Sequence, residues 1–240
     1  MKETTYSLKD ISMIIATYNR SDDLKISLDV IKKFIPKLNE VIIIDQSKTS
    51  KTKDFIKHLH NKKIKYIHTS FPSLARARNL GVKNLSKDSK IVWFIDDDAT
   101  LPHNYFDAIL NIYNKYYNAK GVSAYIKQKS VHSKFESFLR RIFFLEHQSK
   151  NKMKVMSVYG CVYPSALTKV IVAEWLSGVN MSFKREIFDD GMEFDNNLIG
   201  YSLGEDFDFS YRVHKKYNNS LYITPEANVI HRVTPIERFK

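Results

Sequence analysis

The stretch Ile91-Val-Trp-Phe-Ile-Asp-Asp-Asp98 decides the fold, because an uninterrupted apolar run ends abruptly in three carboxylates. Five apolar residues without polar alternation indicate a strand that is buried on both faces, as in a parallel sheet. Ligands of such sheets bind at the carboxyl ends of the strands. Alternation along the extended chain places Asp96 and Asp98 on one side and Asp97 on the other. The stretch therefore predicts an α/β fold with a polar site at the end of this strand.

Three adjacent carboxylates repel one another and raise each other's pKa values unless a cation neutralises them. A divalent ion that prefers oxygen ligands, Mg²⁺ or Mn²⁺, relieves this repulsion and can bridge to a diphosphate. A second interpretation is a cluster that caps a helix beginning near Pro102, because Asp is common at helix starts. Three acidic residues exceed what a cap requires, so the triplet favours a metal site.

Apolar runs and helix-like segments alternate on the amino-terminal side of this stretch. Further buried strands are predicted at Ile11–Ala16, Val41–Ile44 and Ile64–Ile67, and helices at Asp22–Phe34, Thr52–His60, Leu74–Leu85 and Pro102–Tyr117. This order predicts a three-layer α/β/α arrangement around a mainly parallel sheet. The regular alternation weakens near residue 120, without a linker that would mark a domain boundary.

Polar residues follow the other predicted strands at the same edge of the sheet. Thr17-Tyr18-Asn19-Arg20 follows the first strand and Asp45-Gln46 follows the second, and these side chains can hydrogen-bond a base or a ribose. Turn formation explains Asn19 equally well. Arg76 and Arg78 lie near the start of the third predicted helix, where guanidinium groups and free backbone N–H groups suit phosphate. The alternative for either arginine is a solvated helix face.

The second half of the chain contains further polar residues with two interpretations each. Glu205 and Asp206 open a segment with helical spacing, where acidic residues commonly cap the helix. His231 follows a short apolar strand at Asn228–Ile230, and by itself it is interpreted as a structural histidine. The segment 133–154 combines an apolar face with positive charge, so it either packs on the sheet or contacts an anionic membrane.

Six motifs in this order resemble the family 2 glycosyltransferases, inverting enzymes of the GT-A fold that use sugar nucleotides. The motifs are Thr17–Arg20, Asp45, Ala77–Gly81, Phe94–Asp98, Trp175–Arg185 and Gly204–Asp208. The resemblance implies one Rossmann-like GT-A domain over residues 1–240, with a nucleotide-binding half at about 8–120 and an acceptor-binding half at 121–240. It also implies metal-dependent transfer from a nucleotide sugar, with a UDP-sugar favoured, in cell-surface polysaccharide or glycolipid synthesis.

The same resemblance implies roles for individual residues. It assigns nucleotide or donor contacts to Thr17, Tyr18, Asn19, Arg20, Asp45, Gln46, Arg76, Arg78, Asn79, Asp96 and Asp97. It assigns a Mn²⁺ or Mg²⁺ ion to Asp98, Asp96 and His231. The donor-sugar and acceptor pocket is assigned to Trp175, Gly178 and Asn180. Asp206 is the implied general base, and Glu205 is the second candidate. The family often has a second aspartate at the position of Gln46, which leaves uracil and guanine as alternative bases.

The charge of the chain favours an anionic partner. The formal charge is +12, from 38 Lys and Arg against 26 Asp and Glu, although the composition of the encoding genome is an equal explanation. A nucleic-acid-binding protein is the non-enzymatic alternative, but the acidic triplet would repel a phosphate backbone, so no nucleic acid is expected. A sugar-phosphate nucleotidyltransferase is the enzymatic alternative, and it is disfavoured because no Gly-rich loop follows the first strand.

Cysteine content and hydropathy predict the compartment. Cys161 is the single cysteine, so an intrachain disulfide is excluded. The first ten residues lack the apolar stretch of a signal peptide, and no apolar run reaches the length of a membrane span. We therefore expect a cytoplasmic protein that acts on a glycan or lipid-linked acceptor, with peripheral contact to the inner face of the membrane through segment 133–154.

Overall fold

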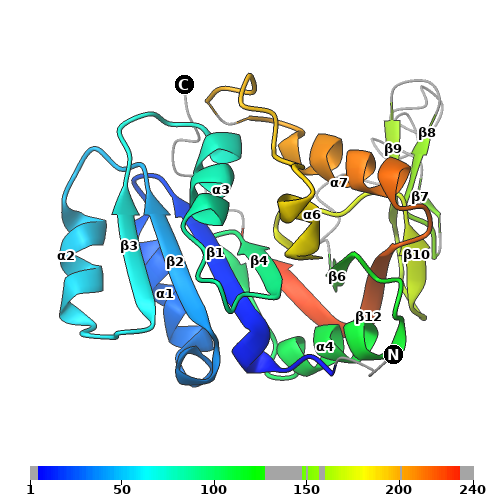
Figure 1. The fold of residues 1–240 in the computed structure, drawn as a ribbon, viewed down its shortest axis with the longest axis horizontal. Helices are drawn as coiled ribbons and strands as arrows, with labels where there is room; N and C mark the ends of the chain where they lie inside the picture. The colour runs from blue at the N-terminus through cyan, green and yellow to red at the C-terminus, as the bar shows by residue number, and fades with distance from the viewer. Residues whose placement is uncertain (1–4, 128–147, 150, 157–159, 201, 233–240) are drawn as a thin grey trace, which may run out of the picture.

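The structure is a computed structural model that describes residues 5–127, 148–149, 151–156, 160–200 and 202–232. A large sheet runs through the molecule (Figure 1). In spatial order its strands are β10 (Ile171–Ala173), β12 (Leu221–His231), β6 (Gly121–Ile126), β11 (Asn180–Lys184), β4 (Ile91–Ile95), β1 (Ile11–Thr17), β2 (Glu40–Asp45) and β3 (Ile64–His68). The short strand β5 (Ala99–Thr100) also pairs with β12. A separate small sheet has the order β7 (Gln148–Ser149), β9 (Gly160–Pro164) and β8 (Lys154–Met156).

Strands β4, β1, β2 and β3 pair in parallel, so their carboxyl ends meet at one edge. Strand β11 enters the sheet antiparallel between β4 and β6, with Asn180 opposite Ile95. This pairing brings the segment before β11 to the end of β4, directly beside the acidic triplet. Strand β12 runs parallel to β6 with a register shift between Thr224 and Asn228, and it ends at His231.

Helices cover both faces of the sheet. One hydrophobic cluster joins the sheet to α1 (Ser21–Ile31), α2 (Lys51–His58) and α4 (Tyr105–Lys115). A second cluster joins the opposite face to α3 (Leu74–Lys83), α6 (Glu186–Asp189) and α7 (Glu205–Lys216). Two 3₁₀ turns, at Leu8–Asp10 and Ile35–Lys37, complete the helical elements of the described residues. The predicted three-layer α/β/α fold with a mostly parallel sheet is confirmed.

Strand β1 shows why the sheet is buried on both faces. Met13 and Ile15 pack in the cluster with α1, whereas Ile14 packs in the cluster with α3. Helix α3 lies very close to the strand at Gly81, where an added Cβ would be 2.6 Å from Cγ2 of Ile14. The close approach places the first turn of α3 near the carboxyl edge of the sheet.

Two sequence predictions about element boundaries need correction. The fourth predicted helix begins at Tyr105 and not at Pro102, whose carbonyl accepts a hydrogen bond from the Tyr105 N–H (3.1 Å). The strand predicted at Asn228–Ile230 is the end of the much longer β12, because the polar residues of β12 hide its apolar pattern. Most of segment 133–154 lies outside the described residues, so its predicted membrane contact stays a prediction. Within the described ranges, no helix has the length and apolarity needed to cross a membrane.

Candidate active site

The acidic triplet divides between two sides of the end of β4. Asp97 is buried and accepts a hydrogen bond from Oγ1 of Thr17 at 2.7 Å. The guanidinium of Arg20 joins Asp97 and Asp98, with ion pairs of 3.0 Å and 2.6 Å. The other oxygen of Asp98 lies 3.1 Å from Nε2 of His231. Asp97 therefore belongs to the network with Thr17, and Asp98 is held between Arg20 and His231.

These contacts move the pKa values of the triplet in different directions. Burial raises the pKa of Asp97 to about 7, although Arg20 and Thr17 oppose the change. Burial also raises the pKa of Asp96, and Arg78 opposes it. Burial acts in the same sense on Asp98, but the hydrogen bonds from His231 and Arg20 outweigh it and hold the pKa of Asp98 well below its ordinary value. Asp98 is thus the member of the triplet that stays ionised most readily.

Asp96, Asp98 and His231 form a candidate metal centre. Each offers one ligand atom, and the three atoms lie within 4.8 Å of one another. Ligands of one small divalent ion, bound at about 2.1 Å, lie roughly 3–4 Å apart, so small side-chain rotations suffice for coordination. Two carboxylates with one imidazole suit Mn²⁺, which accepts mixed oxygen and nitrogen ligands more readily than Mg²⁺ does. The residues present therefore fit a divalent cation, and they are the three that the sequence predicted.

The alternative that the triplet caps a helix is wrong. Helix α4 begins at Tyr105, and its N-cap is Asn104, well beyond Asp98. The carboxylates instead contact Thr17 and Arg20, which are far away in the sequence.

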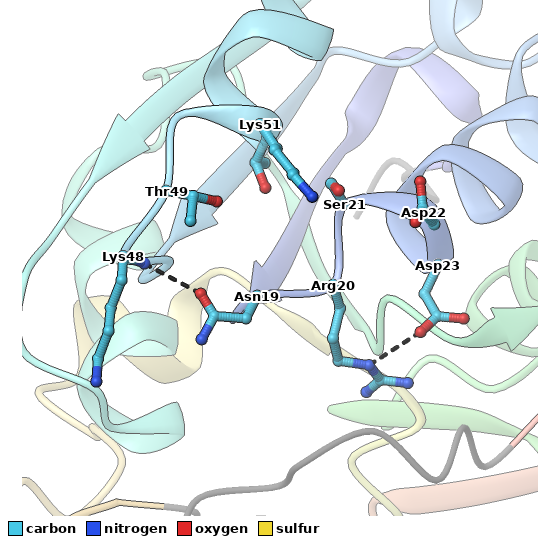
Figure 2. A pocket seen from close by; sticks show the side chains of 9 residues that line it. Asn19, Arg20, Ser21, Asp22, Asp23, Lys48, Thr49 and Lys51 are labelled. Carbon is cyan, nitrogen blue, oxygen red and sulfur yellow. Dashed lines mark hydrogen bonds and ion pairs between the residues drawn. The ribbon is translucent and has the colours of Figure 1, made fainter.

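The ends of β1 and β2 are joined by Asn19. Its backbone, in the left-handed region at φ +54°, donates to Oγ of Ser47 (2.8 Å), and its Oδ1 accepts from the N–H of Lys48 (3.1 Å). A pocket of about 370 Å³ opens beside this junction, lined also by Lys51 (Figure 2). Figure 2 shows Arg20 turned away from Lys48 and toward the carboxylate of Asp23. Asn19 thus holds the two loops together, and the recess beside them is lined by side chains of both charges.

Asp45 and Gln46 make contacts within the protein at the end of β2. Asp45 is fully buried and accepts hydrogen bonds from the Tyr66 hydroxyl (2.7 Å) and the Ser47 N–H (2.9 Å). The amide nitrogen of Gln46 donates to the carbonyls of Phe71 and Ser73, at 2.9 and 3.0 Å. In this structure Gln46 supports the loop that leads into α3, whereas Asp45 holds Tyr66 of β3 and the turn after β2. Their predicted contact with a base stays a prediction.

Arg78 is enclosed rather than exposed to a phosphate. Its side chain is 3% exposed, and its guanidinium forms an ion pair with Glu205, a second ion pair with Asp96 (3.3 Å) and a hydrogen bond to the Gly178 carbonyl (3.1 Å). The residue thereby connects the candidate metal centre to the start of α7. The predicted contact with the donor diphosphate would need one of these partners to be exchanged.

Asp206 is the more accessible carboxylate at the start of α7. Its Oδ2 accepts a hydrogen bond from the Gly178 N–H (2.6 Å), and its Oδ1 accepts one from the N–H of Phe207 (2.8 Å). Glu205 is only 5% exposed and is occupied by Arg78, whereas Asp206 is partly exposed. A general base must reach the acceptor hydroxyl, so the geometry favours Asp206 over Glu205.

Gly178 is predicted to tolerate no side chain. An added Cβ would lie 2.8 Å from Nη2 of Arg78 and 3.1 Å from Cβ of Asp206, so Gly178→Ala must displace one of them. We expect a loss of stability of about 1–3 kcal/mol, typical of overpacking, together with a loss of activity. Thermal unfolding of this variant beside Ser177→Ala, at a half-buried neighbour, checks the prediction. Equal unfolding temperatures for the two variants would contradict it.

Glu205 is expected to make the stability depend on pH. Burial raises its pKa from 4.5 to about 7, with Arg78 opposing. Between these two values the folded chain binds more protons than the unfolded chain, so this contribution to the free energy of unfolding falls as the pH rises. The fall is on the order of 1–3 kcal/mol. Urea unfolding at pH 5 and pH 8 should show a smaller difference for Glu205→Gln than for the original chain; equal differences would contradict the prediction.

Four other predicted residues occupy varied positions. Asn79 is buried. Its amide donates to the Phe194 carbonyl (2.8 Å) and accepts from the Phe194 N–H (2.9 Å), so it ties α3 to the segment that contains Phe194. Arg76 is exposed, with its guanidinium 4.2 Å from the centre of the Phe71 ring. Tyr18 is half-buried after β1. Asn180 is fully buried, and its Oδ1 accepts from the N–H of Ala124 (2.8 Å).

Trp175 lies near Asp206 among aromatic rings. Its ring centre is 5.7 Å from that of Phe207 and 6.2 Å from that of Tyr163. The side chain is 8% exposed, and its indole N–H finds no hydrogen-bond acceptor among the described residues. Gly178 thus contacts Asp206 directly, Trp175 packs against Phe207, which follows Asp206, and Asn180 is buried in the core.

The sequence does not single out Asp23 and Arg232, which belong to the same network. Asp23 accepts from Nε of Arg20 at 3.1 Å, and Arg232 donates to the Asp97 carbonyl at 3.3 Å and to Oγ of Ser27 at 3.1 Å. Arg232 could have been found from its position, because it directly follows His231 at the end of a strand. Asp23 offered no signal beyond its place in the first turn of a helix, where aspartate is ordinary.

Comparison with known proteins identifies relatives. The family model described as glycosyl transferase family 2 matches residues 12–172. An uncharacterised glycosyltransferase of Rickettsia typhi is 28% identical over 183 residues, which are 71% of this chain and 55% of the relative. The chain thus spans about half the length of this curated relative.

Solved structures with similar folds are distant in sequence. The crystal structure of GalNAc-T7 with UDP, GalNAc and Mn²⁺ has a TM-score of 0.69 at 17% identity, over 93% of this chain and 44% of that one. The mannosyltransferase PcManGT of Pyrobaculum calidifontis, in complex with GDP-Man and Mn²⁺, has a TM-score of 0.61 at 19% identity, over 95% and 58%. At these identities the likeness shows the fold, which is the GT-A fold that the sequence predicted. Since the family model covers well over half of the chain, the chain belongs to glycosyl transferase family 2.

Proposed function

We propose that this chain is an inverting, metal-dependent glycosyltransferase that moves a sugar from a nucleoside diphosphate, with UDP favoured, to a hydroxyl of a glycan or lipid-linked acceptor. The observation that carries the proposal is the connection between the candidate metal centre and the candidate base. Arg78 contacts Asp96 of the metal centre, and the same guanidinium bonds the carbonyl of Gly178, whose N–H holds Asp206. These contacts support a donor and a base at adjacent positions at one edge of the sheet.

The donor would lie along the carboxyl edge. We place its nucleoside at the junction of β1 and β2 that Asn19 forms, and its diphosphate at Asp96, Asp98 and His231. Two proteins of similar fold were solved with UDP and Mn²⁺ and with GDP-Man and Mn²⁺, which supports a nucleotide donor here. A divalent cation held by the three residues would supply positive charge against the departing diphosphate. Arg20 keeps Asp98 in place by occupying its second oxygen.

Asp206 would remove the proton of the acceptor hydroxyl. As the hydroxyl oxygen forms its bond to the anomeric carbon, the bond from that carbon to the diphosphate oxygen breaks, and the proton stays on the carboxyl group of Asp206. One displacement at this carbon inverts its configuration and needs no covalent intermediate. The Gly178 N–H orients the Asp206 carboxylate for this step, because it donates to Oδ2 from the backbone at 2.6 Å.

A screen of nucleotide sugars tests the proposal. We expect UDP with Mn²⁺ to raise the unfolding temperature, and one UDP-sugar to release UDP in the presence of the chain. Removal of the metal by EDTA should abolish both effects. Stabilisation by GDP in place of UDP would correct the base, and the absence of any effect across UDP- and GDP-sugars would overturn the proposal. The setting that we propose is cell-surface polysaccharide or glycolipid synthesis at the cytoplasmic side of the membrane.

A further inference from the structure

Three large apolar side chains are exposed on two neighbouring loops, one of which leads to Asp206. Phe71 is 47% exposed, Ile199 is 65% exposed and Leu203 is 84% exposed. Phe71 lies in the loop between β3 and α3, and the other two lie in the loop that leads into α7, at the upper edge of Figure 1. We call these three side chains the apolar lip. Leu203 precedes Asp206 by only three positions, so the loop that carries it leads directly to the proposed base.

The two loops of the apolar lip are held together by hydrogen bonds. Ser73 pairs with Gly200 in an isolated bridge, and its Oγ donates to the Leu198 carbonyl at 2.9 Å. Ser202 donates to the same carbonyl at 2.8 Å and has a left-handed backbone, with φ of +49°. A non-glycine residue in this region is uncommon and persists where surrounding contacts enforce it. These contacts fix Ser202, the residue directly before Leu203.

Positive charge lies beside the apolar lip. The guanidinium of Arg76 stacks on Phe71, and its Nε donates to the carbonyl of Asn196 (3.0 Å). The cation is therefore fixed beside the Phe71 side chain of the apolar lip. Lys48 and Lys51 are exposed at the same carboxyl edge of the sheet. Three exposed apolar groups with adjacent cations are the combination with which peripheral proteins bind anionic bilayers.

We propose that the apolar lip inserts into the surface of an anionic lipid bilayer. A second copy of this chain is a poorer occupant, because two molecules with a formal charge of +12 repel each other. In a bilayer with anionic headgroups, Leu203 and Ile199 can be buried among the acyl chains, and Arg76 can pair with the headgroups. Bound in this way, the chain presents Asp206 to the membrane surface. The further conclusion that the acceptor is anchored in lipid rests on the proposed function.

Vesicle flotation of the whole chain tests the proposal. Vesicles of phosphatidylcholine with phosphatidylglycerol are expected to carry the chain upward, and those of phosphatidylcholine alone are expected to carry much less. The double variant Ile199→Ser, Leu203→Ser should bind about tenfold more weakly. The matched control is Ile26→Ser, Tyr117→Ser, which removes side chains that are 50% and 92% exposed elsewhere on the surface. Added salt should weaken binding by screening the cations.

The outcomes distinguish the apolar lip from other parts of the chain that could bind lipid. Retained binding by the lip variant would overturn the proposal and favour another surface, such as segment 133–154. Failure of the original chain to float with anionic vesicles would also overturn it, as would capture of an acidic protein in preference to vesicles. Both double variants should unfold at the temperature of the original chain. The lip variant should release UDP from a UDP-sugar in free solution at the same rate as the original chain. Vesicle binding and transfer are measured separately. If the original chain binds vesicles but transfers no sugar, the proposed function fails and the lipid contact does not.

Discussion

Asp98→Ala is expected to lower sugar transfer by at least about 10³-fold, the scale of losing a group that stabilises developing charge. Asp98 is the most readily ionised member of the triplet, and it is placed between Arg20 and His231. Without it the metal centre keeps only Asp96 and His231. The fold should survive, because Arg20 retains ion pairs with Asp97 and Asp23. Transfer assays and Mn²⁺ binding, followed by electron paramagnetic resonance, measure the two effects.

A matched control distinguishes loss of the metal from a general loss of charge. Asp29→Ala removes an exposed carboxylate from α1, and it should leave transfer and Mn²⁺ binding unchanged. Asp98→Asn keeps the volume of the side chain and should lose Mn²⁺ binding as Asp98→Ala does. Undiminished turnover in Asp98→Ala, with the metal still required, would contradict the assignment of Asp98 as a metal ligand.

Asp206→Asn is expected to lower the turnover number by about 10²–10⁴-fold while donor binding is retained. The asparagine carbonyl can still accept the hydrogen bond from the Gly178 N–H, although the bond from the Phe207 N–H is lost, so the loop at Gly178 should stay in place. What is lost is the ability to take a proton from the acceptor. UDP-dependent thermal stabilisation, measured beside the transfer rate, separates binding from chemistry.

The neighbouring carboxylates provide the comparison for Asp206. Asp208→Asn removes a partly exposed carboxylate that pairs with Arg212 one turn away, and it should have little effect on transfer. Glu205→Gln should weaken the enclosure of Arg78 without removing the base. If Glu205→Gln abolishes turnover while Asp206→Asn retains it, the roles of the two residues must be exchanged.

Two residues of the candidate metal centre, Asp96 and Asp98, could be predicted from the sequence because the acidic triplet directly follows a buried strand, although alternation along that strand is not what groups them. Strand β4 ends at Ile95, and a turn closed by the hydrogen bond from the Ala99 N–H to the Asp96 carbonyl (3.1 Å) follows it. This turn groups Asp96 with Asp98, whereas Asp97 contacts Thr17. His231 was implied by the resemblance, and it closes the group of three.

Arg78 illustrates what strand and helix patterns do not reveal. Its position in the first turns of a helix suggested an exposed cation for phosphate, yet it is buried and paired with Glu205, which lies 127 positions further along the chain. Gln46 was likewise predicted to contact the nucleotide, yet its amide donates to the carbonyls of Phe71 and Ser73 within the protein. Each of these partners is brought close only by packing of separate elements.

The sequence by itself determined the first four strands, the helices that alternate with them and the edge at which the polar residues gather. These properties depend on periodicity and on residues that are near one another in the chain, so local physics is enough. Only the tertiary structure decided which carboxylate remains accessible for a base, which arginines are enclosed and which apolar side chains stay exposed on the loops before α3 and α7. Those outcomes depend on burial and on charged partners from distant segments, and the energies of such contacts exist only once the sheet and both helical layers have assembled.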